Sequence, residues 1–200
     1  MHDEDDSLML QLQEGQQAAF EQLVRRHQNP LIGFFHRQLR DWQLAEDLTQ
    51  ETLLRVHSTA WDYLPRGTFK AWMYRIARNL MIDTTRRRAH DCLVRAVKGH
   101  PASDDSEEEV IARLSDELPL PDEQLDRRDF ARTVDDLLPC IPEDQRLTFI
   151  LHVFAGLSLP EVAEAMESNL PTTKSRLRLA REKLREKLAA RGIIDPSIAG

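Results

Sequence analysis

The sequence predicts an all-α protein made of two small helical domains joined by an acidic linker. Only 7 of the 200 residues are glycine and 6% are aromatic, which argues against a sheet-rich fold. Apolar residues recur at intervals of three and four through two long stretches, as in amphipathic helices. Between these stretches, residues 103–126 carry many Asp and Glu side chains and a single arginine. We therefore expect a first domain over residues 10–90, a linker over residues 91–121 and a second domain over residues 122–190.

The net charge of −7 argues, taken alone, against a nucleic-acid binder, because neutralising phosphate groups requires Lys and Arg. The charge is, however, segregated along the chain. Residues 171–191 are rich in Lys and Arg and contain only two acidic residues, Glu182 and Glu186. The second domain can therefore present a basic surface although the whole chain is acidic.

Signals for targeting, membranes and metals are weak. Cys92 and Cys140 lie far apart and match no zinc or redox spacing, so we interpret both as ordinary thiols. The acidic N-terminus does not suit a signal peptide, and no apolar run approaches the length of a membrane span. We expect a cytoplasmic protein without membrane insertion, metal or cofactor.

The first domain is expected to begin with two packed helices between Gln16 and Leu39, separated by a break or kink at Asn29–Pro30. A further helix is expected over residues 42–61. Its core side would consist of Leu44, Leu48, Val56, Ala60 and either Thr52 or Leu54. Its opposite side carries Asp47, Gln50, Glu51 and Arg55. Such a polar face is usually an ordinary solvated surface.

A helix from Phe69 to Arg88 carries two stripes of opposite character. The apolar stripe consists of Phe69, Trp72, Ile76, Leu80 and Met81. The polar stripe consists of Arg75, Arg78, Asn79 and Asp83, and three arginines follow it, Arg86, Arg87 and Arg88. One face can join a core while the other contacts phosphates and bases, but an ordinary amphipathic helix fits the pattern about as well.

The segments on either side of this helix lack its pattern. Residues 63–68 read as a loop, in which Thr68 is a candidate N-cap. The helical pattern weakens after His90. From Gly99 to Pro121 the sequence is acidic and contains one short apolar cluster, Val110, Ile111 and Leu114. We expect a tether there, with at most one transient helix.

The second domain is expected to contain a helix from about Asp122, a turn at Pro139–Pro142 and a helix over residues 143–154 that Gly156 ends. Ser158 and Glu161 then match a capping box at the start of a short helix, Pro160–Glu167. A turn at Ser168–Asn169 leads into a basic helix, Leu170–Ala190. Two helices joined by a tight turn are typical of a helix-turn-helix.

The basic helix also divides into two faces. Its apolar stripe consists of Leu170, Thr173, Leu177, Ala180, Leu184 and Leu188. Its first turns place outward, within reach of bases and phosphates, Thr172, Lys174, Ser175, Arg176 and Arg178. A basic helix that serves only solubility is the alternative interpretation.

With these residues in view, the chain resembles a bacterial RNA polymerase sigma factor of the extracytoplasmic-function group. Ala45–Thr52 is similar to the family's core-polymerase-binding signature. Phe69–Asp83, followed by Arg86–Arg88, is similar to its minus-ten recognition helix. Leu138–Arg146, and Gly156–Ala163 followed by Thr172–Arg176, are similar to the entry and the helix-turn-helix of sigma domain four. Each motif is weak alone, but the four in this order are specific.

The resemblance implies a division of labour between the domains. Domain two would dock on the β′ coiled coil of the polymerase core through Asp47, Gln50, Glu51 and Arg55. The loop Leu64–Thr68 would lie against the melted minus-ten strand together with Trp72, Arg75, Asn79 and Asp83, while Arg86, Arg87 and Arg88 hold the backbone. Domain four would contact the β flap and read the minus-thirty-five element through Thr172, Lys174, Ser175, Arg176 and Arg178. The resemblance also implies an anti-sigma partner.

The chain departs from the family pattern at the helix-helix turn. The family usually has Leu-Gly there and a Val-Gly-Thr-Val start to the recognition helix, where this chain has Met166–Thr173. Asn169 can still cap the helix and Pro171 suits its first turn. Glu167, however, replaces a glycine able to adopt a left-handed conformation. The register of the base-contacting residues is therefore open.

Three other functions fit parts of the sequence. A metal-dependent hydrolase could use Glu46, Asp47 and Glu51 with His27, His36 or His57, but no catalytic motif such as HExxH or GxSxG occurs, so we do not expect an enzyme. A DNA-binding regulator could use the first helices only for dimerisation or sensing. A helical adaptor would bind protein alone and show no salt-dependent affinity for DNA.

Overall fold

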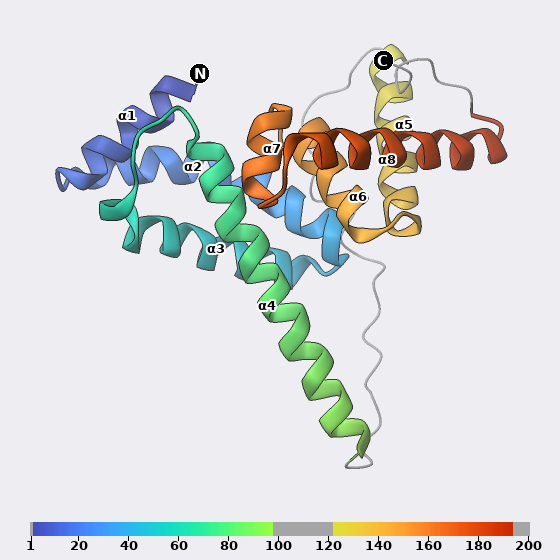
Figure 1. The fold of residues 1–200 in the computed structure, drawn as a ribbon, viewed down its shortest axis with the longest axis horizontal. Helices are drawn as coiled ribbons and strands as arrows, with labels where there is room; N and C mark the ends of the chain where they lie inside the picture. Colours follow the sequence, from blue (N-terminus) through green and yellow to red (C-terminus); the bar gives the residue numbers. More distant parts are fainter. Residues whose placement is uncertain (1, 98–121, 194–200) are drawn as a thin grey trace.

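The computed structural model describes residues 2–97 and 122–193, and within these ranges it contains helices and no β-strand (Figure 1). The predicted all-α class is therefore confirmed. Most of the predicted linker, from residue 98 to residue 121, lies outside the described residues. The apolar cluster Val110, Ile111 and Leu114 lies there too, as does the tail from residue 194.

The first unit contains a helix that the sequence pattern did not predict. This helix, α1 (His2–Gln13), begins before the predicted domain start at residue 10 and buries Leu8, Met9 and Leu12 against the rest of the unit. The remaining elements of the unit are α2 (Gln17–Leu39), α3 (Trp42–Ser58), the 3-10 turn η1 (Ala60–Asp62) and α4 (Phe69–Val97).

The sequence predicts a break or a kink at Asn29–Pro30, and the break is wrong, because one helix, α2, runs from Gln17 to Leu39. Proline inside a helix costs about 3 kcal/mol, since it removes a hydrogen bond and crowds the preceding turn. Here Pro30 lies on the exposed side, while Leu23, His27, Leu31 and Phe34 continue one buried face past it. Burial of that face on both sides of Pro30 favours the continuous helix.

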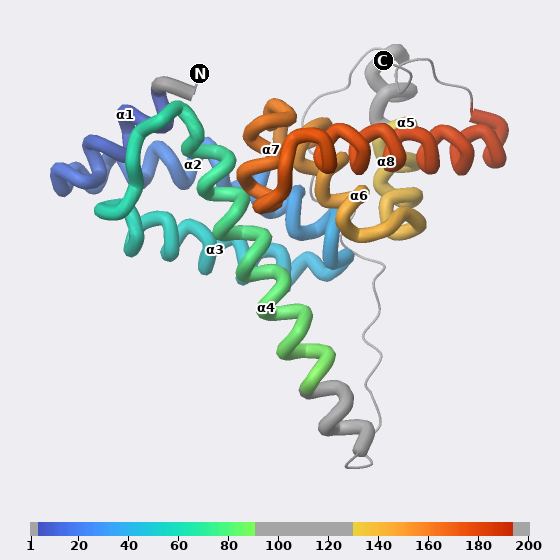
Figure 2. Tube along the Cα trace, in the orientation of Figure 1, coloured from blue at the N-terminus to red at the C-terminus, as the bar shows by residue number. Residues whose placement is uncertain are grey.

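The helix α4 is longer and more deeply buried than its sequence pattern predicts. It continues past His90 to Val97 (Figure 1), and its part up to residue 90 already extends beyond the other helices (Figure 2). Besides the expected Phe69, Leu80 and Met81, its buried residues include Met73, Tyr74 and Ala77. Trp72 and Ile76 are only half-buried. A helix with such a wide buried strip must be packed on more than one side.

The second unit follows the predicted order of helices. It consists of α5 (Asp122–Leu137), the 3-10 turn η3 (Leu138–Cys140), α6 (Glu143–Phe149), the π-helical turn η4 (Ile150–Phe154), α7 (Leu159–Ala165) and α8 (Leu170–Ala190). Cys140 is an exposed free thiol. The inward stripe predicted for α8 is confirmed at Thr173, Leu177, Ala180, Leu184 and Leu188, which are buried, whereas Leu170 at the helix start is only half-buried.

Short-range signals place most helix ends of the second unit correctly, but the predicted helix end at Glu167 is wrong, because α7 ends at Ala165 and Glu167 has φ +50°. Gly156 adopts φ +70° after η4, and the capping box forms, with the backbone N–H of Ser158 donating to Glu161 Oε2 at 2.8 Å. The side chain of Asn169 accepts a hydrogen bond from Thr172 N–H at 2.8 Å and so caps α8. These end signals are confirmed.

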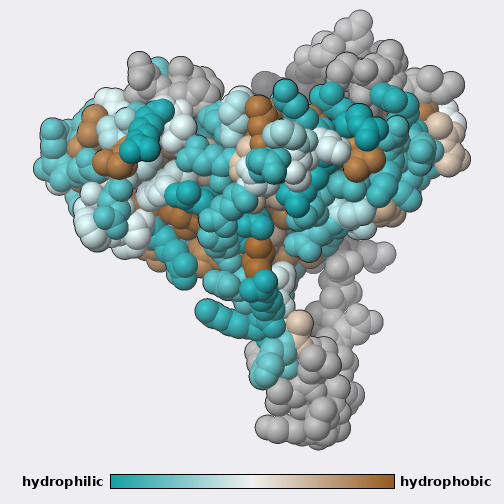
Figure 3. Space-filling model, viewed as in Figure 1, coloured by the Kyte–Doolittle hydropathy of each residue, from teal (hydrophilic) through white to brown (hydrophobic). Residues whose placement is uncertain are grey.

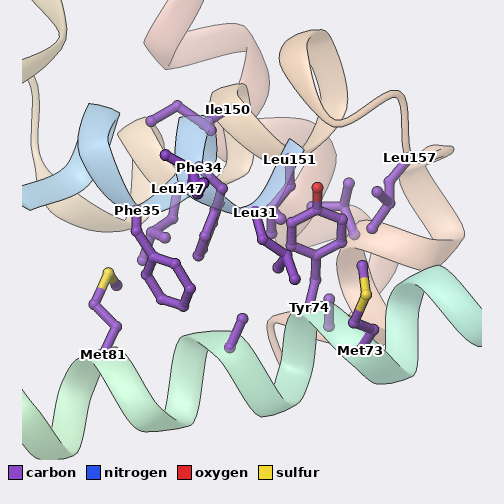
Figure 4. Close-up of a cluster of buried hydrophobic side chains, with 14 of the residues drawn as sticks. Leu31, Phe34, Phe35, Met73, Tyr74, Met81, Leu147, Ile150, Leu151 and Leu157 are labelled. Atoms are coloured by element: carbon purple, nitrogen blue, oxygen red, sulfur yellow. The ribbon is translucent and has the colours of Figure 1, made fainter. Parts of the chain in front are cut away.

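The two units share one hydrophobic core. Tyr74 and Met73 on α4, with Leu31 and Phe34 on α2, lie among side chains of the second unit that include Leu147, Ile150, Leu151 and Leu157 (Figure 4). Tyr74 is only 1% exposed, and this burial raises its pKa. The helix α7 packs against α4, and η4 packs against α2, which explains the wide buried strip on α4.

Polar contacts surround this shared core. Arg37 on α2 donates to Asp135 Oδ1 at 2.9 Å, and its guanidinium lies 4.0 Å above the ring centre of Phe154. Arg40 donates to the backbone oxygen of Asp135, and Arg146 donates to Gln38 Oε1 at 2.8 Å. A paired arginine stacked on an aromatic ring is an oriented contact, so the two units meet in a defined way.

The outer surface is mainly hydrophilic, with isolated apolar patches on the face shown in Figure 3. Over the described ranges, no helix combines the length and the apolar character that crossing a membrane requires.

Candidate polymerase and nucleic-acid interfaces

The polar face of α3 is exposed as the sequence predicts. Asp47, Gln50, Glu51 and Arg55 all point to solvent. Arg55 Nε lies 3.2 Å from Glu51 Oε1, and both side chains are 47% exposed. An exposed pair one helical turn apart contributes little to stability, so both groups remain available to a partner.

An apolar side chain lies within this polar face. Of the two residues considered for the core, Thr52 is the buried one, and Leu54 is 61% exposed. Leu54 follows Asp47 by seven residues and Gln50 by four, so all three share one side of the helix. Charged and amide groups around an exposed leucine are typical of a surface that binds another protein.

The polar stripe of α4 is partly exposed. Arg75 is half-buried, whereas Asn79 and Asp83 are exposed. Trp72 packs its ring against Tyr63 with ring centres 4.9 Å apart, so it supports the loop before α4 while part of it remains accessible. Arg78 has a partner in the second unit, since its Nη1 lies 3.8 Å from Glu167 Oε2.

The three arginines after this stripe differ in their contacts. Arg86 and Arg87 are exposed, and Arg88 Nη1 donates to Asp41 Oδ2 at 2.8 Å. Asp41 also caps α3 by accepting from Leu44 N–H at 2.9 Å. Partial burial alone would raise the pKa of Asp41, but the bonds to Leu44 and Arg88 outweigh it and lower that pKa. Arg88 thus links α4 to the start of α3.

The loop between η1 and α4 is exposed at its tip and held at its base. Leu64 is 60% exposed and Trp61, at its entry, 75% exposed. Tyr63 is buried, and its hydroxyl donates to Asp6 Oδ1 at 2.6 Å. Burial and this acidic partner raise the pKa of Tyr63, so the hydroxyl remains a donor. Exposed aromatic and aliphatic side chains are suited to stacking on unpaired bases.

The first turns of α8 expose most of the residues predicted for DNA contact. Lys174, Ser175 and Arg178 are exposed, and Thr172 is half-buried. Arg178 pairs with Glu182 one turn later at 3.1 Å. Arg176 is held more firmly, because its side chain is 25% exposed and paired with Asp144 at the start of α6.

The turn between α7 and α8 keeps a tight geometry without glycine. Glu167 adopts φ +50°, a left-handed conformation that costs a residue with a side chain about 1–2 kcal/mol. Ser168 Oγ lies 2.9 Å from Thr173 Oγ1, which ties the turn to α8. The departure from the family pattern therefore changes the residue at the turn but not the helix-turn-helix.

The acidic residues considered for a metal site do not gather. Glu46 Oε1 instead accepts from Trp42 Nε1 at 2.8 Å. Among the described residues, no three His, Cys, Asp or Glu side chains are grouped closely enough to hold a metal ion.

Models of two regions of the sigma-70 family match the two units. Residues 23–91 match Sigma-70 region 2, and residues 131–184 match Sigma-70, region 4. The chain belongs to the sigma-70 family. Region 2 covers the polar face of α3 and the stripe of α4, and region 4 covers the helix-turn-helix, in the order that the sequence predicts.

Curated relatives identify the group within the family. The RNA polymerase sigma-H factor of Pseudomonas aeruginosa is 29% identical over 90% of this sigma factor and 91% of the relative. The ECF RNA polymerase sigma factor SigE of Mycolicibacterium smegmatis is 32% identical over 88% of this chain and 65% of the relative. The resemblance to the extracytoplasmic-function group is therefore confirmed.

Solved structures with the same fold include two complexes. CnrH, solved in complex with the cytosolic domain of CnrY, has a TM-score of 0.67 at 25% identity, over 94% of this sigma factor and 99% of that chain. RpoE of Bartonella quintana, solved with the anti-sigma factor NepR, has a TM-score of 0.64 at 24% identity, over 85% and 96% of the two chains. The second likeness shows the fold alone.

Sequence reasoning missed three residues at these surfaces. Trp61 and Leu54 are exposed apolar side chains beside predicted contact residues, and their positions relative to those residues are a signal that could have identified them. Asp6 is buried beneath the loop, and no local pattern indicates its partners.

Proposed function

We propose that this sigma factor binds the RNA polymerase core and directs initiation at promoters whose minus-ten element the first unit reads and whose minus-thirty-five element the second unit reads. The observation that carries this proposal is the order of exposed surfaces along the chain. A polar face on α3 is followed by a loop and polar stripe at α4, and a basic helix-turn-helix lies at the end.

The core-binding surface is the exposed face of α3 with Asp47, Gln50, Glu51 and Arg55. Leu54 in the middle of this face supplies apolar contact area. The polar groups around it can form hydrogen bonds and ion pairs that orient the partner. The β′ coiled coil of the polymerase is the partner that the family resemblance implies. The β flap is the corresponding partner for the second unit.

The minus-ten surface combines the loop 64–68 with α4. Its groups are Trp72, Arg75, Asn79 and Asp83, with Arg86 and Arg87 exposed further along the helix and Arg88 beside them. Amide, carboxylate and aromatic groups suit the edges and faces of unpaired bases, while arginines neutralise phosphates. These properties favour contact with a melted strand.

The minus-thirty-five surface is the start of α8. Lys174, Ser175 and Arg178 are ready for phosphate or base contacts, with Thr172 at the helix start. Arginine can form a bidentate hydrogen-bonded contact with guanine in the major groove. In the free chain the guanidinium of Arg176 forms an ion pair with the Asp144 carboxylate. Arg176 must break this ion pair before it can contact guanine.

The packed arrangement of the two units cannot read both promoter elements at once. The elements lie about 25 base pairs apart, which is about 85 Å of duplex at about 3.4 Å per step. A compact chain of 200 residues is about 40 Å across. We therefore propose that the units separate when the polymerase core binds.

A regulatory protein that favours the packed arrangement is part of this proposal. CnrH, of similar fold, was solved with the cytosolic domain of CnrY, and RpoE of Bartonella quintana was solved with an anti-sigma factor. A partner that binds the packed form would prevent the two DNA surfaces from reaching both promoter elements together. A cytoplasmic location follows from a role at the transcription machinery.

The first test is co-elution of the purified chain with core polymerase that lacks a specificity subunit. We expect a complex at low and moderate ionic strength. Gln50→Ala or Asp47→Ala should weaken it while circular dichroism shows the same helix content. Gln28→Ala, an exposed glutamine on α2, is the matched control. Failure of the unaltered chain to co-elute would overturn the proposal.

The second test separates the two DNA surfaces. Arg176→Ala should weaken binding of the reconstituted holoenzyme to the minus-thirty-five element and leave its affinity for the core unchanged. Arg191→Ala, an exposed arginine just beyond α8, controls for loss of charge. Loss of core affinity with unchanged promoter preference would show that the two units have been assigned the wrong roles.

A further inference from the structure

The loop before α4 is held by α1, a helix that takes no part in the proposed DNA surface. Asp6 on α1 uses both carboxylate oxygens for this. Its Oδ1 accepts from the Tyr63 hydroxyl at 2.6 Å, and its Oδ2 accepts from the Gly67 backbone N–H at 2.5 Å. The carboxylate therefore binds both ends of the segment Tyr63–Gly67.

A second side chain of α1 fixes the turn that leads into this loop. Gln13 Nε2 lies 2.8 Å from the backbone oxygen of Ala60 and 2.8 Å from that of Tyr63. Together, Asp6 and Gln13 contact three backbone groups and one side chain between Ala60 and Gly67. Helix α1 thus specifies the path of the chain on both sides of Tyr63.

The rest of the loop has little else to hold it. Leu64 is 60% exposed, and Pro65 and Arg66 are exposed as well. Behind them is a hollow between α1 and the loop, lined by side chains that include Ser7, Gln22 and Arg26. Because apolar packing is sparse at these three residues, the loop is held mainly by the hydrogen bonds from α1 and by the packing of Tyr63 on Trp72.

The neighbouring carboxylate, that of Asp5, contacts α2 and not the loop. Asp5 is also buried, but it pairs with Arg26 at 2.6 Å and His27 at 3.1 Å on α2. Burial alone would raise the pKa of Asp5, but the bonds and charges of His27 and Arg26 outweigh it and lower that pKa. Asp5 therefore attaches α1 to α2, and Asp6 attaches α1 to the loop.

We propose that Asp6, supported by Gln13, is a positioning residue for minus-ten recognition that sets the conformation of the loop Leu64–Thr68 without touching DNA. The proposal rests on the function proposed above. It predicts that selectivity among minus-ten sequences can be lost while binding to the polymerase core is retained.

The experiment uses the full chain with Asp6→Ala, Asp6→Asn and Asp5→Ala. Amide hydrogen exchange of the free chain follows Gly67, whose N–H is bonded only while the carboxylate is present. Transcription by reconstituted holoenzyme on promoters that differ only in the minus-ten bases gives the selectivity. A hydrogen bond to a charged group such as this carboxylate is worth roughly a factor of 10–100 in such an equilibrium. We expect Asp6→Ala to speed exchange at Gly67 and to lower selectivity by roughly that factor.

The other two variants separate positioning from general loosening of α1. Asparagine can accept from Gly67 N–H through its oxygen and donate to the Tyr63 hydroxyl through its amide, so Asp6→Asn should recover most of the selectivity. Asp5→Ala should lower the melting temperature and keep the selectivity, because Asp5 does not contact the loop.

Three outcomes with the variants would overturn the inference. Exchange at Gly67 that is unaffected by Asp6→Ala would show that the carboxylate does not hold the loop. Faster exchange with unchanged selectivity would show that the loop conformation does not matter for recognition. Equal loss of selectivity in Asp5→Ala and Asp6→Ala would indicate only a loosened helix. If the unaltered holoenzyme shows no promoter selectivity, the proposed function itself fails and this inference fails with it.

Discussion

Two short segments precede the two proposed DNA-reading helices, and they are held in opposite ways. The loop before α4 takes its partners from α1, 47 to 61 residues away. The turn before α8 is held by residues close to it in the sequence. Asn169 caps α8 by accepting from Thr172 N–H, and the Ser168 hydroxyl forms a hydrogen bond with the Thr173 hydroxyl. The first segment can therefore be altered from a distance, whereas the second is set by its own few residues.

The difference also appears in the residues with positive φ. The loop before α4 has Gly67 at φ +71°, the residue type that tolerates this conformation. The turn before α8 has Glu167 at φ +50°. The distantly held loop thus carries little backbone strain, and the locally held turn carries more. Each of the following measurements breaks or sharpens this contrast.

The largest effect is expected from Gly67→Ala. A Cβ at Gly67 would meet nothing within 4 Å, so the cost arises from the left-handed φ. This strain is about 1–2 kcal/mol, and the smaller freedom of alanine in the unfolded chain offsets part of it in urea denaturation. Gly15→Ala is a matched control, because Gly15 has φ +87° and equally open surroundings but lies outside the loop. Both variants should lose stability, and only Gly67→Ala should lose minus-ten selectivity. Equal selectivity in the two variants would contradict the distinction.

Asn169→Ala should come next, with a loss of about 1 kcal/mol, since it removes the side-chain cap of α8. The loss should be confined to the second unit, where hydrogen exchange near the start of α8 should quicken. Asn169→Asp retains an acceptor for Thr172 N–H and should restore the stability. An aspartate variant as unstable as the alanine variant would show that the cap is not the cause.

Glu167→Gly should stabilise the chain by about 0.5 kcal/mol. Relief of the left-handed strain is worth about 1–2 kcal/mol, and the extra freedom of glycine in the unfolded chain offsets part of it. The contact with Arg78 is long, at 3.8 Å, and the Glu167 side chain is 59% exposed, so its loss offsets only a small part of the gain. A lower melting temperature for Glu167→Gly would show that the turn is not strained.

The smallest effect is expected from pH, at the contact between the units. Burial, together with the charges of Arg40 and Arg37, lowers the pKa of His36 below its ordinary 6.5, while Asp135 and Asp41 act in the opposite direction. The unfolded chain therefore takes up this proton at a higher pH than the folded chain does. The stability that His36 contributes is complete above about pH 6.5 and is lost as the pH falls toward the folded-state pKa.

This pH effect can be isolated with His36→Phe, which keeps a ring against Trp42 and removes the titrating group. Between pH 7.5 and pH 5.5, the melting temperature of the unaltered chain should fall more than that of the variant. Parallel curves for the two proteins would assign the effect to other groups. The turn before α8 is held by amide and hydroxyl groups and should show no such dependence.

The same contrast explains how much of the molecule could be predicted from the sequence. Gly156, the capping box at Ser158 and Glu161, and the Asn169 cap act within a few residues, so their patterns identified the helix ends. The sequence order of the surfaces on α3, α4 and α8 was likewise visible as periodic stripes. The site residues on them are exposed or half-buried, although their contacts with partners stay predictions.

Features that depend on distant partners were not predictable in this way. The acidic start of α1 looks like a solvated tail, yet Asp5 and Asp6 are buried. Their hydrogen-bond partners, which include Arg26 and Gly67, lie 21 to 61 residues further along the chain, so no local pattern indicates the burial. Pro30 is a local signal for a break, and the continuous buried face of α2 outweighs it. The packing of α7 on α4 buries Met73 and Tyr74, which a single-helix pattern cannot indicate.

The core common to both units has a practical consequence for work with fragments. A piece ending near Val97 would lack Leu147, Ile150, Leu151 and Leu157, and so would leave apolar side chains of α2 and α4 uncovered (Figure 4). Uncovered apolar patches promote self-association in solution. Either half produced alone should therefore aggregate more readily than the intact chain, unless a partner protein covers the exposed face.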